Sequence, residues 1–170
     1  MDIKTILIDK EKKILKKWEE VVMGRYDPQA VSIFKKQKDQ FANPLGYKTS
    51  TGLKELYEII CDESDQEIET PALGQFVKLM AVQEVNPSEA LKFVFTIKRI
   101  VRKAAGKKKI SDQEWEAFDN RVDGVALALF DIYSASREQL WEVRYEDFEK
   151  KRFALTREGG VCPSALLNDE

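Results

Sequence analysis

Proline constrains this chain more than any other residue type, because four of its five prolines directly follow a residue that caps helices. A proline inside a helix breaks it, but at the first helical position its missing N–H costs nothing. The preceding Asp, Asn or Thr side chain accepts a hydrogen bond from a free amide of the first turn. The four pairs are Asp27-Pro28, Asn43-Pro44, Thr70-Pro71 and Asn86-Pro87. Each pair predicts a helix that begins at or next to its proline.

Capping boxes mark helix starts independently of proline. Asn86 and Ser111 are each followed three residues later by a glutamate, Glu89 and Glu114 respectively. Together with the opening segment, these signals predict six helices. The predicted helices span about Thr5 to Met23, Pro28 to Gln40, Leu45 to Cys61, Pro71 to Glu84, Pro87 to Ala105 and Ser111 to Phe153.

No segment has the pattern of a β-strand. The β-branched residues recur at helical spacing, and no Asn-Gly or Asp-Gly turn joins two alternating runs. We therefore expect an all-α fold, a single-domain bundle of about six helices with a long C-terminal helix. The helical domain is expected to cover residues 1–153, and residues 154–170 are expected to form a flexible tail.

The last two predicted helices carry the apolar residues expected at the centre of the core. On the first of them, apolar side chains cover well over half of the circumference, which is typical of a buried helix. They are Ala90, Leu91, Phe93, Val94, Phe95, Ile97, Ile100, Val101 and Ala104. On the last helix, a packing seam is predicted by apolar residues three or four positions apart. These are Trp115, Phe118, Val122, Val125, Leu129 and Ile132.

The predicted last helix is long for a domain of this size. About 43 residues would span ~64 Å, whereas a helix of about 20 residues already crosses a small domain. Either it bends near Gly124 or Ser134–Ser136, so that its second half folds back onto the first helix, or that half projects. A projecting half would expose the apolar residues Leu140, Trp141, Val143, Tyr145 and Phe148, of which Leu140, Trp141, Val143 and Phe148 are the candidate dimer stripe. The obvious cover for such a stripe is the same helix of a second copy, which predicts a homodimer.

The absence of histidine excludes several classes of function. No His-based general acid or base, His-ligated metal or His-ligated haem can form, and no glycine-rich phosphate loop is present. Cys61 and Cys162 are too few for a disulfide framework or a zinc site, and their sparsity favours a reducing compartment. We expect no enzymatic activity, no metal and no cofactor.

Charge and hydropathy address location and nucleic-acid binding. Neither a signal peptide nor a membrane span is predicted, because the apolar runs are short, so a cytoplasmic location is expected. Residues 91–110 carry eight basic and no acidic side chains, although the whole chain has a net charge of −2. A solvated edge that pairs with the acidic last helix is favoured over a nucleic-acid surface.

Two charged residues occupy helix faces that are otherwise apolar or small. Lys98 shares its face with Leu91, Val94, Phe95 and Val101, so its ammonium group is expected to need an internal partner. Asp131 is the candidate partner, and Arg137 is a weaker third case. The alternative is that these side chains reach water at the edge of the core.

A family resemblance follows from an ordered set of short segments. Phe41-Ala42-Asn43-Pro44-Leu45-Gly46-Tyr47 resembles the F-x-N-P-x-G segment of the RsbRD N-terminal domain family. The segments Ala81-Val82-Gln83, Pro87-Ser88-x-Ala90, Phe95-Thr96-Ile97-Lys98, Phe130-Asp131-x-Tyr133 and Arg137-Glu138 match in the same order. Trp18 and Tyr26 match earlier aromatic positions.

This resemblance implies a non-enzymatic, all-helical sensory or regulatory domain of bacterial stress signalling. In full-length relatives a long helix leads into a sulfate-transporter/anti-sigma-antagonist (STAS) domain that contacts the RsbT kinase. The chain resembles free-standing versions without that domain, and its expected partner is an unidentified protein. The candidate network for a ligand or partner consists of polar residues in or next to the matched segments. These are Gln83, Ser88, Lys98, Asp131, Tyr133, Arg137 and Glu138.

Two functions therefore remain open. The first is a regulatory interaction domain that pairs through its last helix and relays a signal to a protein. The second is a small-molecule or redox-responsive binding protein with a pocket between helices, reporting through Cys61 or Cys162. A sizeable apolar cavity lined by Lys98 or Arg137 would favour the second function.

Overall fold

Helices make up all the regular secondary structure of the described residues, which are 2–26, 43–62, 70–83 and 85–159 of a computed structural model. The helices are α1 (Ile3–Met23), α3 (Pro44–Cys61), α4 (Pro71–Val82), α5 (Pro87–Leu91), α6 (Phe93–Ala105) and α7 (Asp112–Gly159). The predicted all-α fold with a long C-terminal helix is confirmed. The predicted helix over residues 28–40 lies outside the described residues.

The predicted helix starts have the expected chemistry at most positions. Asn43 Oδ1 accepts from the Gly46 amide at 2.9 Å, and Thr70 Oγ1 accepts from the Leu73 amide at 3.2 Å. Ser111 and Glu114 form a reciprocal capping box, because each side chain accepts from the other residue's backbone N–H. Asn86 is different, since its side chain makes no cap hydrogen bond although a proline follows it.

The predicted helix from Pro87 to Ala105 is divided at Lys92, which separates α5 from α6. Neither glycine nor proline marks this break in the sequence. The first carbonyl of α6, that of Phe93, accepts hydrogen bonds from the Trp18 indole N–H at 2.9 Å and from the Thr96 hydroxyl at 2.6 Å. A hydrogen bond from α1 therefore reaches the chain at the residue where α6 begins.

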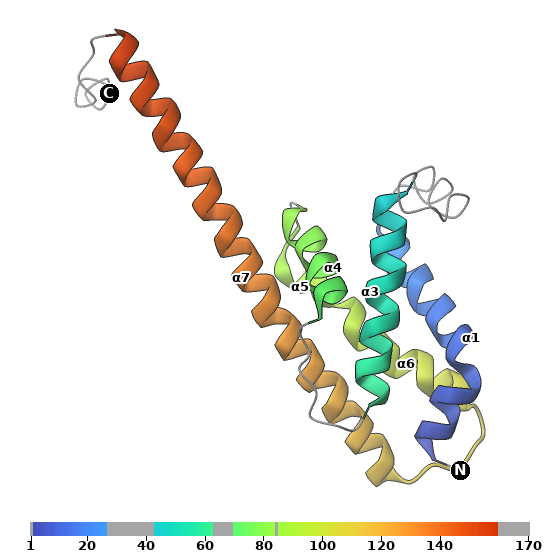
Figure 1. Cartoon of the computed structure of the whole chain (residues 1–170). Helices are drawn as coiled ribbons and strands as arrows, with labels where there is room; N and C mark the ends of the chain where they lie inside the picture. Colours follow the sequence, from blue (N-terminus) through green and yellow to red (C-terminus); the bar gives the residue numbers. More distant parts are fainter. Residues whose placement is uncertain (1, 27–42, 63–69, 84, 160–170) are drawn as a thin grey trace.

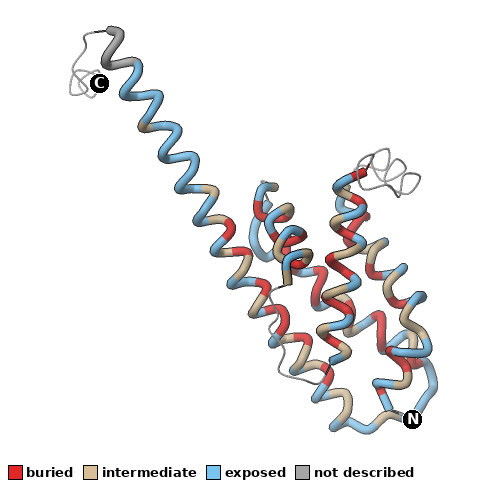
Figure 2. The backbone as a smooth tube through the Cα atoms, in the orientation of Figure 1, coloured by how far each residue is buried: buried red, intermediate tan, exposed pale blue. Residues whose placement is uncertain are grey.

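The core lies where α1, α3, α4 and α6 come together against the first half of α7 (Figures 1 and 2). In this arrangement α1 packs on α6, α3 on α4, and α4 on α7. The Phe93 ring is at the centre, with the Trp18 and Phe76 rings 5.9 and 5.7 Å away between centroids. Phe95 was expected in this core but is 48% exposed, because α6 buries only the sides that face its neighbours.

The last helix, α7, continues beyond the body as one uninterrupted helix (Figure 1). Its 48 residues correspond to about 72 Å, at 1.5 Å per residue. The last buried residue along it is Ser136, and nearly all described positions after Leu140 are exposed (Figure 2). The projecting arrangement is thus correct and the bend is wrong. The helix ends at Gly159, later than the expected end near Phe153; residues 160–170 lie outside the described part.

No helix in the described ranges combines the length and the apolar character that a bilayer span requires.

Candidate functional site

The point where α7 leaves the body is held by Arg137. Its guanidinium Nη1 donates to the carbonyl of Ala81 at 3.0 Å. Ala81 belongs to the last turn of α4, whose carbonyls have no partner within their own helix. A cation there also interacts favourably with the negative end of the helix dipole. Arg137 therefore joins the end of α4 to the middle of α7.

Tyr133 lies one turn before Arg137 on α7 and is only 1% exposed. Its hydroxyl has no hydrogen-bond partner among the described residues. Ser136, next to Arg137, donates to the Ile132 carbonyl of its own helix at 2.7 Å. The predicted residues Tyr133 and Arg137 are thus brought together where buried and projecting parts of α7 meet.

The corner between α4 and α5 is held by the residues that follow α1. The Gln83 side-chain amide donates to the Tyr26 hydroxyl at 2.7 Å. Arg25 Nη1 donates to the Ala90 carbonyl at 2.9 Å, and burial lowers the pKa of this guanidinium. Two segments of the sequence resemblance, residues 81–83 and 87–90, therefore form one corner against the end of α1.

Ser88 and Glu138 do not join this network. Both are exposed, and within the described residues no hydrogen bond of either side chain is found.

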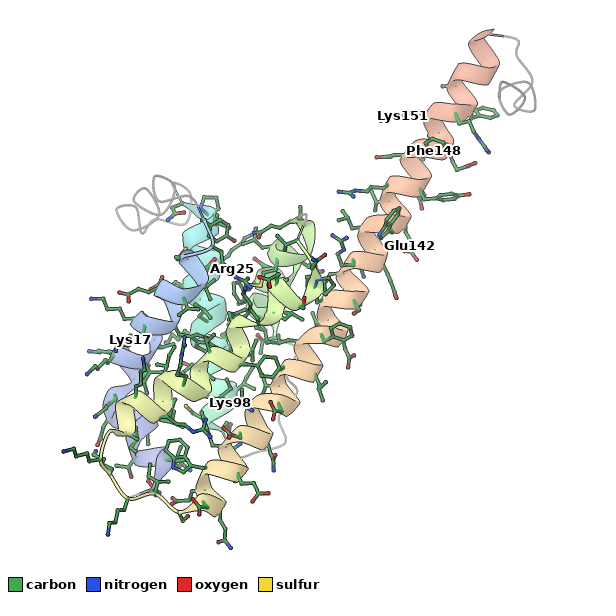
Figure 3. The ribbon with its side chains drawn as sticks, turned by 180° about the vertical axis from the view of Figure 1, so that it is seen from behind. Lys17, Arg25, Lys98, Glu142, Phe148 and Lys151 are labelled. Atoms are coloured by element: carbon green, nitrogen blue, oxygen red, sulfur yellow. The ribbon has the colours of Figure 1, made fainter. Side chains whose placement is uncertain are left out.

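Lys98 pairs with Asp123 and not with the predicted Asp131. Its ammonium lies 2.7 Å from Asp123 Oδ1 and 5.8 Å from the centroid of the Phe95 ring. The Lys98 side chain is 19% exposed and that of Asp123 is 49% exposed, so the half-buried cation has a partner, but this partner lies at the edge of the core and reaches water. Asp131 is exposed on α7 and does not reach it. Figure 3 shows Lys98 where α6 faces α7.

The sequence did contain a signal for the correct partner. Lys98 and Arg102 are four residues apart on α6, and Asp119 and Asp123 are four residues apart on α7. The structure pairs them in reverse order, since Arg102 binds Asp119 while Lys98 binds Asp123. Matched four-residue spacings of opposite charge on antiparallel helices predict such a double pair. Lys98 and Arg102 belong to the basic segment, residues 91–110, so these ion pairs neutralise two of its positive charges.

The segment Asn43-Pro44-x-Gly46 has a structural role. Asn43 is buried and caps α3, and its side chain lies over Gly46. A Cβ atom at residue 46 would lie 2.2 Å from Asn43 Nδ2, so a larger residue there would displace the side chain that caps α3. The preceding residues of the matched segment, Phe41 and Ala42, lie outside the described residues.

Two surface cavities can be described, and neither is lined by Lys98 or Arg137. One, of about 340 Å³, lies between α1 and α3. The other, of about 260 Å³, lies between the start of α1 and the first turns of α7 and includes Cys61. Burial raises the pKa of the Cys61 thiol to about 11, so at neutral pH it is a thiol and a poor nucleophile. Cys61 therefore does not favour the redox-responsive function, and Cys162, its other candidate reporter, lies outside the described residues.

Metal ligands do not cluster in the described ranges. No group of three or more Cys, Asp or Glu residues there could hold a metal ion.

The predicted apolar stripe divides between two faces of α7. Trp141 and Phe148 are seven residues apart and share a face, to which Tyr145 also belongs. These side chains are 65%, 61% and 64% exposed, respectively. Val143, also exposed, and the half-buried Leu140 lie on another face.

The sequence of the chain was compared with known proteins. The family described as "RsbT co-antagonist protein rsbRD N-terminal domain" matches residues 13–147. No curated protein and no solved structure matches the chain. The matched range covers the second half of α1, all of α3 to α6 and most of α7; it includes Arg137, Trp141 and Tyr145 and ends one residue before Phe148. The resemblance seen in the sequence is confirmed, and the chain belongs to the RsbRD N-terminal domain family.

Proposed function

We propose that this protein is a non-enzymatic regulatory domain of bacterial signalling that transmits the state of its helical body through α7. It acts as a homodimer and on a protein partner, in the cytoplasm. The observation that carries the proposal is the course of α7. Arg137 fixes the helix to the end of α4, and exposed aromatic side chains at Trp141, Tyr145 and Phe148 follow directly.

Family membership supports a signalling role, because the family is named for co-antagonist proteins. The geometry of the body supports it as well. A ligand or partner that displaced the α4–α5 corner would act on the Ala81 carbonyl, and hence on Arg137 and α7. The two sites to be coupled are the α4–α5 corner and the exposed aromatic face. A continuous helix can couple them, and α7 carries both the Arg137 contact and the aromatic face.

Assembly is tested by light scattering at micromolar concentration. The wild type should scatter as twice 19.6 kDa. Trp141→Glu should give a helical monomer, because it places a charge in both copies of a desolvated stripe, at a cost on the order of several kcal/mol. Val143→Glu is the matched control, since it adds the same charge two residues away on another face, and it should remain dimeric. A wild-type monomer of 19.6 kDa would contradict the proposed dimer.

The partner is tested by affinity capture from cells grown with and without stress, using wild type, Val143→Glu and Trp141→Glu as baits. A specific protein should bind the first two baits and not the third, with an amount that changes on stress. Identical captured proteins for all three baits would contradict a role for the exposed face of α7.

A further inference from the structure

The exposed aromatic face of α7 extends from the projecting part back onto the body. Leu127 and Phe130 are 69% and 48% exposed and stand three residues apart. Trp141, Tyr145 and Phe148 continue the same face, at helical spacings of fourteen, eighteen and twenty-one residues from Leu127. The seam that packs on the body is a different face, which includes Val122, Leu129 and Tyr133. A second surface can therefore cover the aromatic face without displacing the body.

The aromatic face is bordered by two rows of opposite charge. Arg137, Arg144 and Lys151 recur every seven residues along one border. Glu142 and Glu149 recur every seven residues along the other. Figure 3 shows Glu142, Phe148 and Lys151 on the part of α7 beyond the body.

Several of these charges remain available for a partner. Arg144, Lys151 and Glu142 form no ion pair within the described part of the chain. Glu149 pairs with Arg152 of its own helix at 2.9 Å, across an exposed surface where such pairs contribute little. Arg137 is already bonded to the Ala81 carbonyl. The pair that matters most for assembly is therefore Arg144 with Glu149.

We infer that a second copy of the chain covers this face, with the two α7 helices parallel. The inference rests on the proposed homodimer and adds the face and the orientation. In a parallel two-fold pair, the basic border of one helix faces the acidic border of the other. Arg144 then faces Glu149 of the partner subunit, five residues further along, the spacing of ion pairs in parallel coiled coils. In an antiparallel pair the basic borders of the two helices would face each other, and so would the acidic borders. The like charges would repel.

Parallel pairing has a geometric consequence for the whole assembly. Both bodies lie at one end, and both ends at Gly159 lie together at the other. The aromatic residues Trp141, Tyr145 and Phe148 each meet their own copy across the two-fold axis.

The orientation is tested by charge reversal, with the dimer dissociation constant as the readout. Arg144→Glu and Glu149→Arg should each raise this constant by about five- to tenfold, because each creates two like-charge contacts per parallel dimer. The double variant should return to within about twofold of the wild type. Lys150→Glu, an exposed reversal on another face, should leave it unchanged.

Unchanged dissociation constants in both single variants, with Trp141→Glu still monomeric, would overturn the parallel orientation and leave the proposed homodimer intact. A monomeric wild type would overturn both. The helical circular dichroism of every variant should match that of the wild type, since none of these side chains is buried.

A distance measurement gives a second, independent test. Asn120→Cys, in a Cys61→Ser, Cys162→Ser background, carries a spin label at an exposed position of α7. Parallel helices with axes about 10 Å apart place the two labels within about 30 Å of each other. An antiparallel pair centred on Tyr145 would separate them by about 75 Å along the axis, at 1.5 Å per residue. The long distance would overturn the inference.

Discussion

Lys98 shows how a half-buried charge depends on one neighbour. Asp123→Ala removes the carboxylate 2.7 Å from its ammonium and leaves the cation without its partner. We expect a loss of about 1 kcal/mol in the free energy of unfolding, because the Lys98 side chain is only 19% exposed whereas the carboxylate that it loses is 49% exposed and screened by water. Urea denaturation measures this loss. Adding Lys98→Met should recover part of it, since methionine keeps the apolar stem without the charge.

Asp131→Ala is the matched control for this prediction. Asp131 is an exposed aspartate on the same helix, so its removal should change the unfolding free energy by less than about 0.5 kcal/mol. Equal losses for Asp123→Ala and Asp131→Ala would show that the Lys98–Asp123 pair does not stabilise the fold.

At the residue scale, the sequence predicts that a group needs a partner more readily than it predicts which partner. The apolar neighbours of Lys98 on its own helix follow from helical spacing, and the half-buried cation was predicted correctly. The choice between Asp123 and Asp131 depends on the register of α7 against α6. That register is set by packing across the whole core, and the available signal for it was the matched four-residue spacing of opposite charges on the two helices. Tyr133, buried with an unpartnered hydroxyl, is a second feature that spacing alone does not reveal.

The contact between α3 and α4 depends on the absence of a side chain at Gly52. A Cβ atom there would lie 2.5 Å from the Phe76 Cβ, and neither atom can move without moving its helix. Gly52→Ala should therefore lower the unfolding free energy by about 1–3 kcal/mol. Gly74 of α4 provides the control, because a Cβ at that position meets nothing within 4 Å. Gly74→Ala should stabilise the protein by about 0.5–1 kcal/mol. Thermal unfolding of the two variants should thus shift in opposite directions, and a shift of the same sign would contradict this packing.

At the element scale, helix starts are predicted more reliably than divisions within a helix. Proline and cap residues act through bonds to their own next turn, so Asn43, Thr70 and Ser111 could be recognised from the sequence. The break at Lys92 coincides with a bond from Trp18, a residue about seventy-five positions earlier in the chain. No local pattern encodes such a contact.

The coupling of α7 to the body can be tested through Arg137. Arg137→Ala removes the donor to the Ala81 carbonyl, and we expect a loss of about 1 kcal/mol in the local stability of this junction. Hydrogen exchange should speed up in the last turn of α4 and in α7 around Tyr133. Lys150→Ala, which removes an exposed cation further along α7 on a face outside the proposed dimer contact, should leave both segments unchanged. Equal exchange in the two variants would mean that Arg137 does not hold α7.

For the molecule as a whole, the sequence indicated the length of the last helix but left its course open. Gly124 and Ser134 are residues at which a bend was plausible, yet nothing in the sequence required one. A bend would need surface on the body to bury the second half of α7. The body buries α7 only as far as Ser136, so the helix continues outward. The outward course of α7 then exposes Trp141. The sequence predicts that Trp141 belongs to an apolar stripe but does not indicate which other stripe residues share its face of the helix.

The straight course of α7 makes it a lever arm. From Arg137 to Gly159 the helix rises by about 33 Å, at 1.5 Å per residue. A tilt of about 10° at the Ala81 contact would swing the tip by about 6 Å, slightly more than the 5.4 Å pitch of one helical turn. A small angular adjustment inside the body is thereby magnified into a displacement as large as the spacing between successive turns.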